Sequence, residues 1–462
     1  MAGDDRLMVS VSGVRGTIGA TLTPQVACDF GCALAAMLGA GSKVVLARDT
    51  RPSGPMVRNA VAAGLLAGGV HVIDLGVATT PGAALMTRKL GAHGGVVITA
   101  SHNPAPYNGI KFLQPTGTGL TAATAGRLKE IYERRGFVLA DADRQGRESR
   151  NTRAHAEHVD AVVAQIDALA ISAKRYKVVL DSINGAGCVE TPMLLGRLGC
   201  EVMHLNGEAT GRFAHAPEPI EENLAELCQA VRRYKALAGF AQDPDADRLV
   251  LVDEFGVFIG EEYTLALAAA FVLTRRKGKL AANLVTSRMI DDVAAAAGVE
   301  VVRAPTGEAN VVEAMQREGC IFGGEGGGGV IEPKVVPVRD SLVGIAYVLQ
   351  YMTDTGLRLS QLVSQLPRYT MLKTKLPCPA GQDGPLAATQ AILAATHQAF
   401  AGETGARFND ADGLRIDLPA GWVCVRASNT EPILRIIAEA KDAATAQALV
   451  DKVRKAAEGV AG

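Results

Sequence analysis

Residues 237–253 read Leu-Ala-Gly-Phe-Ala-Gln-Asp-Pro-Asp-Ala-Asp-Arg-Leu-Val-Leu-Val-Asp. Two short apolar runs enclose three carboxylates, Asp243, Asp245 and Asp247, which alternate with a proline and an alanine. Short continuous apolar runs are typical of strands that are covered on both faces of a sheet. Because Pro244 disfavours a helix through the carboxylates, the segment predicts two buried strands joined by an acidic loop.

The acidic loop calls for a counter-charge. Three carboxylates held between buried strands repel one another unless a cation neutralises them. No His or Cys lies within the loop, and an oxygen-only ligand set favours Mg²⁺ over zinc. A solvated acidic turn is the alternative, but the apolar flanks favour a metal site. We therefore predict that Asp243, Asp245 and Asp247 hold one Mg²⁺ per chain.

The same alternation of buried strands and helices extends outward from this segment. It predicts three similar α/β sets, in which short apolar strands are interspersed with helix-forming segments, and the strands of the first set each exit into a polar or Gly/Pro loop. Strands are expected at 43–47, 71–75, 95–99, 177–181, 249–253, 280–286, 300–303 and 320–323, and helices at 24–38, 57–67, 261–275, 288–297 and 308–318.

The pattern changes near Tyr369. From there a strand, a helix at 386–401, three strands within 406–437 and a last helix at 443–458 are expected, which is an α+β arrangement. We expect an α/β fold of three similar mixed α/β domains and one C-terminal α+β domain. The predicted limits are 1–150, 151–254, 255–367 and 368–462.

Composition restricts the function further. The chain has 462 residues, and its 47 basic and 48 acidic residues give a net charge of −1. A nearly neutral chain lacks the basic field that nonspecific nucleic-acid binding requires, and no apolar run approaches the ~20 residues that span a bilayer. The N-terminus does not resemble a signal peptide, and the eight cysteines form no CxxC pair. We expect a cytoplasmic protein without nucleic-acid or membrane partners.

A hydroxyl loop follows the strand expected at 95–99. The segment Thr99-Ala-Ser-His-Asn-Pro104 places Ser101 and His102 on an exposed turn, where Ser101 could act as a nucleophile or phospho-acceptor. An ordinary Ser/Asn turn is the alternative. A Ser-His-Asp hydrolase is disfavoured because the G-x-S-x-G elbow is absent.

Two later loops carry binding chemistry. Gly323-Gly-Glu-Gly-Gly-Gly-Gly329 places the single carboxylate of Glu325 in nearly bare backbone, which suits hydroxyls or amines; a flexible turn is the alternative. The segment that begins at Arg426 gathers a guanidinium, hydroxyls and an amide, which suits phosphate; a polar β-turn is the alternative. By contrast, His155 and His158 fall in a polar helical linker, where we expect a solvated face rather than a metal pair.

Together, the four loops resemble those of the α-D-phosphohexomutase superfamily, in the family's order and over essentially the whole chain. The resemblance implies four domains around a central cleft. It also implies that Ser101 is a phosphoserine positioned by His102, and that a phosphoserine oxygen completes the Mg²⁺ site of Asp243, Asp245 and Asp247. The further residues that it implies are Arg248, Arg15 and Lys111 for orientation, proton transfer or transition-state charge; Glu325 and Gly327 for the sugar; and Arg426, Ser428, Asn429 and Thr430 for the substrate phosphate.

The implied reaction is the reversible conversion of a hexose 6-phosphate to a hexose 1-phosphate through a bisphosphorylated intermediate, with hexose 1,6-bisphosphate as activator and a monomer or homodimer as the working form. Gly327 and Gly329 stand where many members carry Ser and His. In this the chain is most similar to the phosphoglucosamine mutase branch, which implies glucosamine 6-phosphate as substrate. A phosphomannomutase or phosphoglucomutase is the alternative, and a Mg²⁺-dependent phosphatase and a non-catalytic sugar-phosphate sensor are the remote ones.

Overall fold

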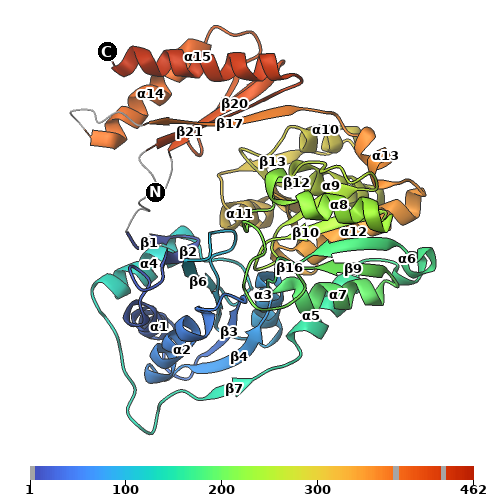
Figure 1. Cartoon of the computed structure of the whole chain (residues 1–462). Coiled ribbons are helices and arrows are strands. Elements are labelled where there is room, and N and C mark those ends of the chain that lie inside the picture. The colour runs from blue at the N-terminus through green and yellow to red at the C-terminus, as the bar shows by residue number, and fades with distance from the viewer. Residues whose placement is uncertain (1–5, 378–383, 428–432, 462) are drawn as a thin grey trace.

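The first of four β-sheets is built from the N-terminal third of the chain. In the computed structural model, which describes residues 6–377, 384–427 and 433–461, this sheet has the order β1-β2-β6-β5-β3-β4-β7 (Figure 1). Thr23 caps the first helix by accepting from the Val26 N–H, as the Thr-Pro start predicts. The elements are β1 Met8–Ser10, β2 Gly13–Thr17, α1 Pro24–Leu38, β3 Lys43–Arg48, α2 Gly54–Ala67, β4 His71–Val77, α3 Thr80–Lys89, β5 Gly94–Ile98, β6 Tyr107–Leu113, α4 Ala122–Glu133 and β7 Glu148–Arg150.

The second sheet has four strands in the order β11-β10-β8-β9. Strands β8, β9 and β10 are parallel, and β11 is antiparallel to β10, so the acidic loop connects two adjacent strands. The elements are α5 Ala154–Val163, α6 Ala168–Lys174, β8 Lys177–Asp181, α7 Gly187–Arg197, β9 Glu201–Leu205, the 3₁₀ helix Glu221–Asn223, α8 Ala225–Tyr234, β10 Ala238–Gln242 and β11 Leu249–Asp253.

The third sheet has five strands in the order β13-β12-β14-β15-β16. Its first strand in the chain ends at Asn283, three residues before the predicted end. The chain turns there because Asn283 Oδ1 accepts from the Val285 N–H at 3.0 Å and from Thr286 Oγ1 at 2.9 Å. The elements are α9 Glu262–Arg275, β12 Leu280–Asn283, α10 Met289–Ala296, β13 Val301–Ala304, α11 Glu308–Glu318, β14 Phe322–Glu325, β15 Gly329–Glu332, β16 Val336–Arg339, α12 Ser341–Thr355 and α13 Leu359–Ser364.

The fourth sheet is antiparallel throughout, with the order β17-β21-β20-β19-β18. Between its two helices the described residues form four strands where three were predicted, and the edge strand among them, Arg407–Asn409, pairs with β19. The elements are β17 Thr370–Pro377, α14 Gly384–Phe400, β18 Arg407–Asn409, β19 Leu414–Leu418, β20 Gly421–Ala427, β21 Ile433–Ala440 and α15 Ala443–Ala461.

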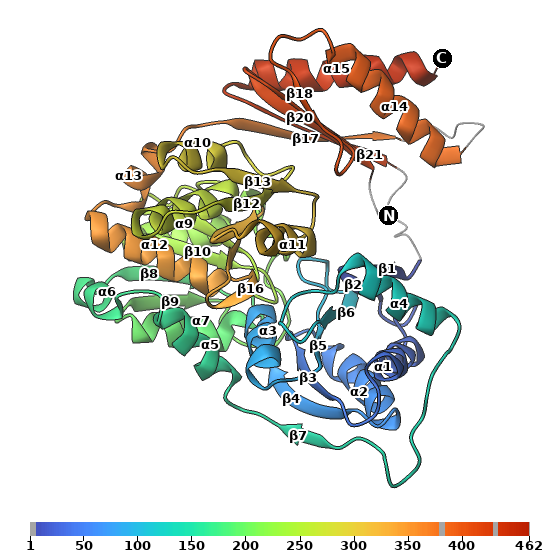
Figure 2. The ribbon, with the colours of Figure 1, turned by 180° about the vertical axis from the view of Figure 1, so that it is seen from behind.

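We number the domains I to IV by their sheets. Domains I to III share one continuous apolar core, which includes Val45 and Ala83 of domain I, Phe240 of domain II and Val343 of domain III. The described part of domain IV has its own core, around Ile416, Ile436 and Val453. Both views of the ribbon show domain IV apart from domain I, with β17 leading into it from domain III (Figures 1 and 2). None of the described helices is long and apolar enough to cross a bilayer.

Candidate active site

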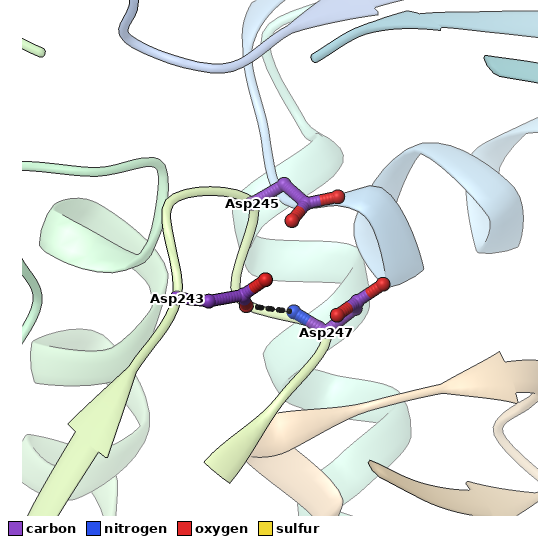
Figure 3. Close-up of side chains that lie close together, drawn as sticks. All are labelled: Asp243, Asp245 and Asp247. Carbon is purple, nitrogen blue, oxygen red and sulfur yellow. Dashed lines mark hydrogen bonds between the residues drawn. The ribbon is translucent and has the colours of Figure 1, made fainter. Parts of the chain in front are cut away.

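The acidic loop forms a compact turn between β10 and β11 (Figure 3). Asp243, Asp245 and Asp247 are completely buried, and one oxygen from each lies within 4.8 Å of the others. The loop is held by Asp243 Oδ1, which accepts from the backbone N–H groups of Asp247 and Arg248 at 3.1 Å. The structure therefore gathers three carboxylates that the sequence only placed close together along the chain.

Two of these carboxylates each have one oxygen occupied and one oxygen free. Asp245 Oδ2 accepts from Thr80 Oγ1 and Lys111 Nζ, both at 2.6 Å. Asp247 Oδ2 accepts from Arg339 Nη2 at 2.7 Å and Lys111 Nζ at 3.2 Å. The Oδ1 atoms of Asp245 and Asp247 are buried without a hydrogen-bond partner. A buried carboxylate oxygen without a partner is costly, so this all-oxygen donor set fits a hard divalent cation such as Mg²⁺.

The charges of the loop are unevenly compensated. Burial, followed by repulsion from Asp247 and Asp245, raises the pKa of Asp243 well above its usual range. Burial would also raise the pKa of Asp247, but Arg339, Lys111 and Arg248 outweigh it and lower that pKa. Burial would lower the pKa of Lys111, but Asp245 and Asp247 outweigh it and raise it. Lys111 therefore acts as a fixed cation between two carboxylates.

Ser101 lies in the loop between β5 and β6 and reaches the acidic loop from domain I. Its side chain is 1% exposed, and its Oγ donates to Asp243 Oδ2 at 2.7 Å. His102 Nδ1 is 3.4 Å from Ser101 Oγ. Ser101 has φ 48°, in the left-handed region, a conformation that costs about 1–3 kcal/mol in a residue other than glycine and is concentrated at functional sites.

Arg51 holds this strained loop and was not singled out from the sequence. Its Nη2 donates to the carbonyls of Ser101 at 2.6 Å and Asn103 at 2.7 Å. Its Nη1 donates to those of Pro104 and Tyr107, both at 3.0 Å. Arg51 ends the polar segment Asp49-Thr-Arg that follows β3, and polar loops after parallel strands often line sites. The position of Arg51 in a polar loop after a parallel strand was the signal in the sequence that could have identified it.

Arg15 lies beside the serine loop, to which His102 itself belongs. Arg15 Nη1 donates to Asn103 Oδ1 at 3.0 Å, and burial lowers the pKa of Arg15. Burial, with the cations Arg248 and Arg15, lowers the pKa of His102 to about 3. The imidazole next to the Ser101 hydroxyl is therefore neutral and surrounded by guanidinium groups, a polarity suited to an anion.

Glu325, at the end of β14, is connected to the acidic loop through one arginine. Its Oε1 accepts from Asn283 Nδ2 at 2.8 Å and the Gly307 N–H at 3.1 Å. Its Oε2 accepts from Arg339 Nη1 at 2.8 Å, and the same guanidinium donates to Asp247. The structure thus joins the glycine-rich loop to the acidic loop through Arg339, a residue to which sequence reasoning assigned no role.

Arg426 lies near the end of β20, in domain IV. Its Nε lies 3.2 Å from Asp412 Oδ2, and that oxygen accepts from the Thr306 N–H at 3.0 Å. Thr306 directly precedes Gly307, which donates to Glu325. The other predicted phosphate ligands lie outside the described residues: Ser428, Asn429 and Thr430.

Profiles of four protein domains match the chain in order. They are described as phosphoglucomutase/phosphomannomutase alpha/beta/alpha domains I, II and III, over residues 6–138, 156–256 and 260–369, and C-terminal domain, over 374–456. This chain belongs to the phosphoglucomutase/phosphomannomutase family. The domain limits proposed from the sequence stay predictions.

Curated members of this phosphoglucomutase/phosphomannomutase family are similar over nearly the whole chain. A protein of Thermococcus kodakarensis named phosphoglucomutase/phosphomannomutase is 39% identical and covers 93% of each chain. A protein of Methanopyrus kandleri named probable phosphoglucosamine mutase is 36% identical over 97% of this chain and 98% of its own. The crystal structure of a phosphoglucomutase/phosphomannomutase family protein from Burkholderia thailandensis has a TM-score of 0.84 at 28% identity and covers 98% of each chain.

Close packing explains why position 329 of the glycine-rich loop is a glycine, but it does not explain Gly327. A Cβ at Gly329 would lie 2.2 Å from Arg339 Cδ, so the arginine stem already fills that space. A Cβ at Gly327 would lie 3.5 Å from Arg248 Nη1, an ordinary contact distance. Of these two glycines, Gly329 is therefore required by sterics and Gly327 is not.

The expectation for the paired histidines was wrong for His158. Its side chain is completely buried, whereas that of His155 is 22% exposed. The polar residues around His158 suggested a solvated helix face, but carboxylates from two distant segments, Glu190 and Asp340, cover it. Contacts of that kind leave no periodic signal in the sequence of a single helix.

Proposed function

We propose that this chain is a phosphohexomutase that interconverts glucosamine 6-phosphate and glucosamine 1-phosphate, with Ser101 as the phosphoryl carrier. The observation that carries the proposal is the 2.7 Å contact between Ser101 Oγ and Asp243, beside buried carboxylate oxygens that lack partners. Phosphoryl transfer needs in-line positioning and neutralised oxygens more than covalent chemistry from the protein. The strained serine loop, whose carbonyls Arg51 holds by hydrogen bonds, supports positioning, and the neighbouring carboxylates support binding of a neutralising cation.

The proposed cycle transfers a phosphoryl group from Ser101 to the sugar and returns one to Ser101. The free hydroxyl of the sugar attacks the phosphorus of phospho-Ser101, the P–Oγ bond breaks, and the hydroxyl proton passes to Ser101 Oγ. The bisphosphate then reverses its orientation in the site. Its other phosphate is transferred to Ser101, and the sugar oxygen that it leaves gains a proton. His102, whose Nδ1 is 3.4 Å from Oγ, would relay that proton, and Arg15 and Lys111 would stabilise the transferring group.

The acidic loop would hold the cation of this reaction. Asp243, Asp245 and Asp247, with an oxygen of phospho-Ser101, would be the ligands of Mg²⁺. When bound, the ion supplies positive charge to the phosphoryl oxygens. Arg248, adjacent to Asp247, would orient the phosphoserine or the substrate, and hexose 1,6-bisphosphate would load Ser101 at the start of turnover.

Glucosamine is the sugar that the glycine-rich loop supports best. Glu325, in the glycine-rich loop, would offer a carboxylate to a protonated 2-amino group. A relative named probable phosphoglucosamine mutase covers 97% of the chain. Arg426, Ser428, Asn429 and Thr430 would hold the phosphate that is not transferred. Phosphomannomutase or phosphoglucomutase activity is the second candidate, favoured by the name of the 39% identical relative.

A coupled isomerisation assay tests the proposal. Purified protein with Mg²⁺ and catalytic hexose 1,6-bisphosphate is given glucosamine 6-phosphate, glucose 1-phosphate or mannose 1-phosphate. We expect the highest kcat/KM with glucosamine 6-phosphate and loss of all three activities in Ser101→Ala. Ser364→Ala, which changes an exposed serine at the end of α13, is the matched control.

The alternatives predict different results. Release of orthophosphate together with an acid-labile phospho-aspartate would identify a phosphatase. Tight sugar-phosphate binding without turnover in both the parent and Ser101→Ala would identify a sensor. Isomerisation that survives in Ser101→Ala would exclude the proposed phosphoserine cycle.

A further inference from the structure

His158 is a completely buried histidine between two carboxylates. Its Nδ1 lies 2.9 Å from Glu190 Oε2 and its Nε2 lies 2.7 Å from Asp340 Oδ2, and all three side chains are 0% exposed. A carboxylate accepts hydrogen bonds, so both ring nitrogens donate and the ring is an imidazolium. Burial would lower the pKa of His158, but Asp340 and Glu190 outweigh it and raise it to about 10. The buried charge is therefore compensated from two sides.

This cluster joins three domains. His158 on α5 and Glu190 on α7 belong to domain II, and Asp340 is the N-cap of α12 in domain III, where it accepts from the Leu342 N–H at 2.9 Å. Thr79, the N-cap of α3 in domain I, donates from Oγ1 to Glu190 Oε2 at 2.6 Å. One imidazolium thus fixes the junction at which the ends of two helices from different domains meet.

The neighbours of these capping residues hold the acidic loop. Thr80, next to Thr79, donates from Oγ1 to Asp245 Oδ2 at 2.6 Å and from its N–H to the Asp245 carbonyl at 3.0 Å. On the other side of the loop, Ser341 Oγ donates to the Ala246 carbonyl at 2.6 Å. Arg339 Nη2 donates to Asp247 Oδ2 at 2.7 Å.

Three consecutive residues of the loop are therefore held from two segments, 79–80 and 339–341. His158 touches neither the loop nor Ser101 directly. Its influence has to pass through Glu190 and Thr79 on one side and through Asp340 on the other. Both routes are short, because Thr80 follows Thr79 directly and Asp340 lies between Arg339 and Ser341.

A metal ion does not explain the cluster. Separations of 2.7–2.9 Å between His158 nitrogens and carboxylate oxygens are direct hydrogen bonds. An ion between them would need about 2.0–2.2 Å to each ligand atom and would push the ligand atoms further apart. The cluster is a buried ionic hydrogen-bond network, in which removing one partner leaves the others charged and unpaired.

We propose that His158 is a positioning residue for the cation site, which fixes segments 79–80 and 339–341 so that Asp245 and Asp247 present their free oxygens to the metal. This inference rests on the proposed function. A positioning role of this kind acts on metal affinity and on the chemical step more than on sugar binding, because none of the residues in the network contacts Glu325 except through Arg339.

The test measures metal binding and catalysis separately in the full-length protein. Mg²⁺ affinity is determined by calorimetry without substrate, and kcat and KM for glucosamine 6-phosphate are determined at increasing Mg²⁺. In His158→Gln we expect Mg²⁺ affinity to fall about 10-fold or more and kcat at 1 mM Mg²⁺ to fall to a similar extent, with sugar KM changed less than about 3-fold. Excess Mg²⁺ should restore most of kcat, because mass action refills a disordered site but does not repair a damaged fold.

Matched variants keep the test decisive. His155 is the more exposed histidine bonded to Glu190, and that hydrogen bond lies within domain II. For His155→Gln we expect Mg²⁺ affinity within about 2-fold of the parent. If His158→Gln does not fold, Asp340→Asn gives the answer, because it retains Oδ1 as a helix cap and loses the acceptor for His158 Nε2. We expect it to weaken Mg²⁺ binding as His158→Gln does.

Two results would overturn the inference. One is a folded His158→Gln or Asp340→Asn protein with parental Mg²⁺ affinity and kcat, even if its melting temperature has fallen. The other is a loss of kcat that excess Mg²⁺ leaves unchanged. Either result would leave the phosphoserine cycle intact, since that cycle is tested by Ser101→Ala.

Discussion

The stem of Arg339 decides which residue can stand at position 329. Its guanidinium donates to Asp247, Glu325 and Glu308 at 2.7, 2.8 and 3.1 Å, so the stem cannot swing aside without breaking charged hydrogen bonds. Such bonds are roughly twice as strong as neutral ones. A side chain at position 329 would therefore disturb both the acidic loop and the sugar loop.

This packing predicts opposite outcomes for two neighbouring glycines. We expect Gly329→Ala to lower kcat by about 10²-fold, the effect of an error of about 1 Å in the position of a catalytic group. Gly327→Ala meets ordinary contact distances and should keep kcat within about 3-fold. Steady-state kinetics on both variants checks this, and equal activities would contradict the role given to the Arg339 stem.

Arg51 should contribute strongly to stability as well as to loop geometry. Arg51→Met leaves Asp49, which is 0% exposed and 3.1 Å from Arg51 Nε, without its cationic partner. Removing one member of a buried pair costs about 3–5 kcal/mol, and we expect that loss in the free energy of unfolding by urea. Arg134→Met, at a residue 78% exposed, should change it by less than about 1 kcal/mol. Similar losses in both variants would show that Arg51 is not specially placed.

At the scale of elements, the contact between α5, α7 and the start of α12 should make stability depend on pH. The pKa of His158 is raised to about 10 from about 6.5 in an unfolded chain, so its contribution is complete below about pH 6.5 and is lost as pH rises toward 10. The slope is up to about 1.4 kcal/mol per pH unit. The pKa of Glu190 is lowered, so the contribution of Glu190 to the free energy of unfolding is lost as the pH falls.

Unfolding by urea at several pH values between 7 and 10 measures this slope. We expect the free energy of unfolding to fall more steeply in the parent than in His158→Gln, which has no imidazole to titrate. Identical slopes in the two proteins would show that His158 keeps an ordinary pKa.

The acidic loop as an element should be stabilised by its cation. The buried Oδ1 atoms of Asp245 and Asp247 gain a partner when Mg²⁺ binds, and a ligand at 100 times its Kd adds about 2.7 kcal/mol to the folded state. We expect Mg²⁺ to raise the melting temperature and EDTA to reverse the rise. Asp245→Asn should remove most of the response, whereas Asp141→Asn, at an exposed site, should retain it.

At the scale of the whole molecule, we expect domain IV to unfold as a separate cooperative unit. One apolar core runs through domains I to III, in addition to separate clusters within each of them, whereas the core of the described part of domain IV is not connected to it. Separate cores unfold with separate free energies. We expect two calorimetric transitions, and hydrogen exchange should assign the residues from β17 onward to one of them. A single transition with uniform exchange would show that the interface between domains III and IV couples all four domains.

Much of this architecture could be predicted from local sequence. The helix at 24–38 and the strands around the acidic loop occur as expected, because capping residues and apolar periodicity act over a few neighbouring residues. The serine and acidic loops were also foreseeable, since each concentrates its chemistry in about six consecutive positions. One strand too few was expected between the last two helices, because an exposed edge strand such as 407–409 needs no apolar pattern.

The amino-acid sequence by itself determined the fold class, the order of the four loops and the carboxylates that would meet a cation. Only the tertiary structure decided that Arg51 holds the serine loop, that Arg339 joins Asp247 to Glu325, and that His158 is buried. The reason is distance along the chain: His158 and Asp340 are 182 positions apart, and Arg339 and Asp247 are 92. A charged side chain on a polar helix looks solvated until folding brings its partner from another domain, and the free energy of that contact depends on burial, which no local pattern records.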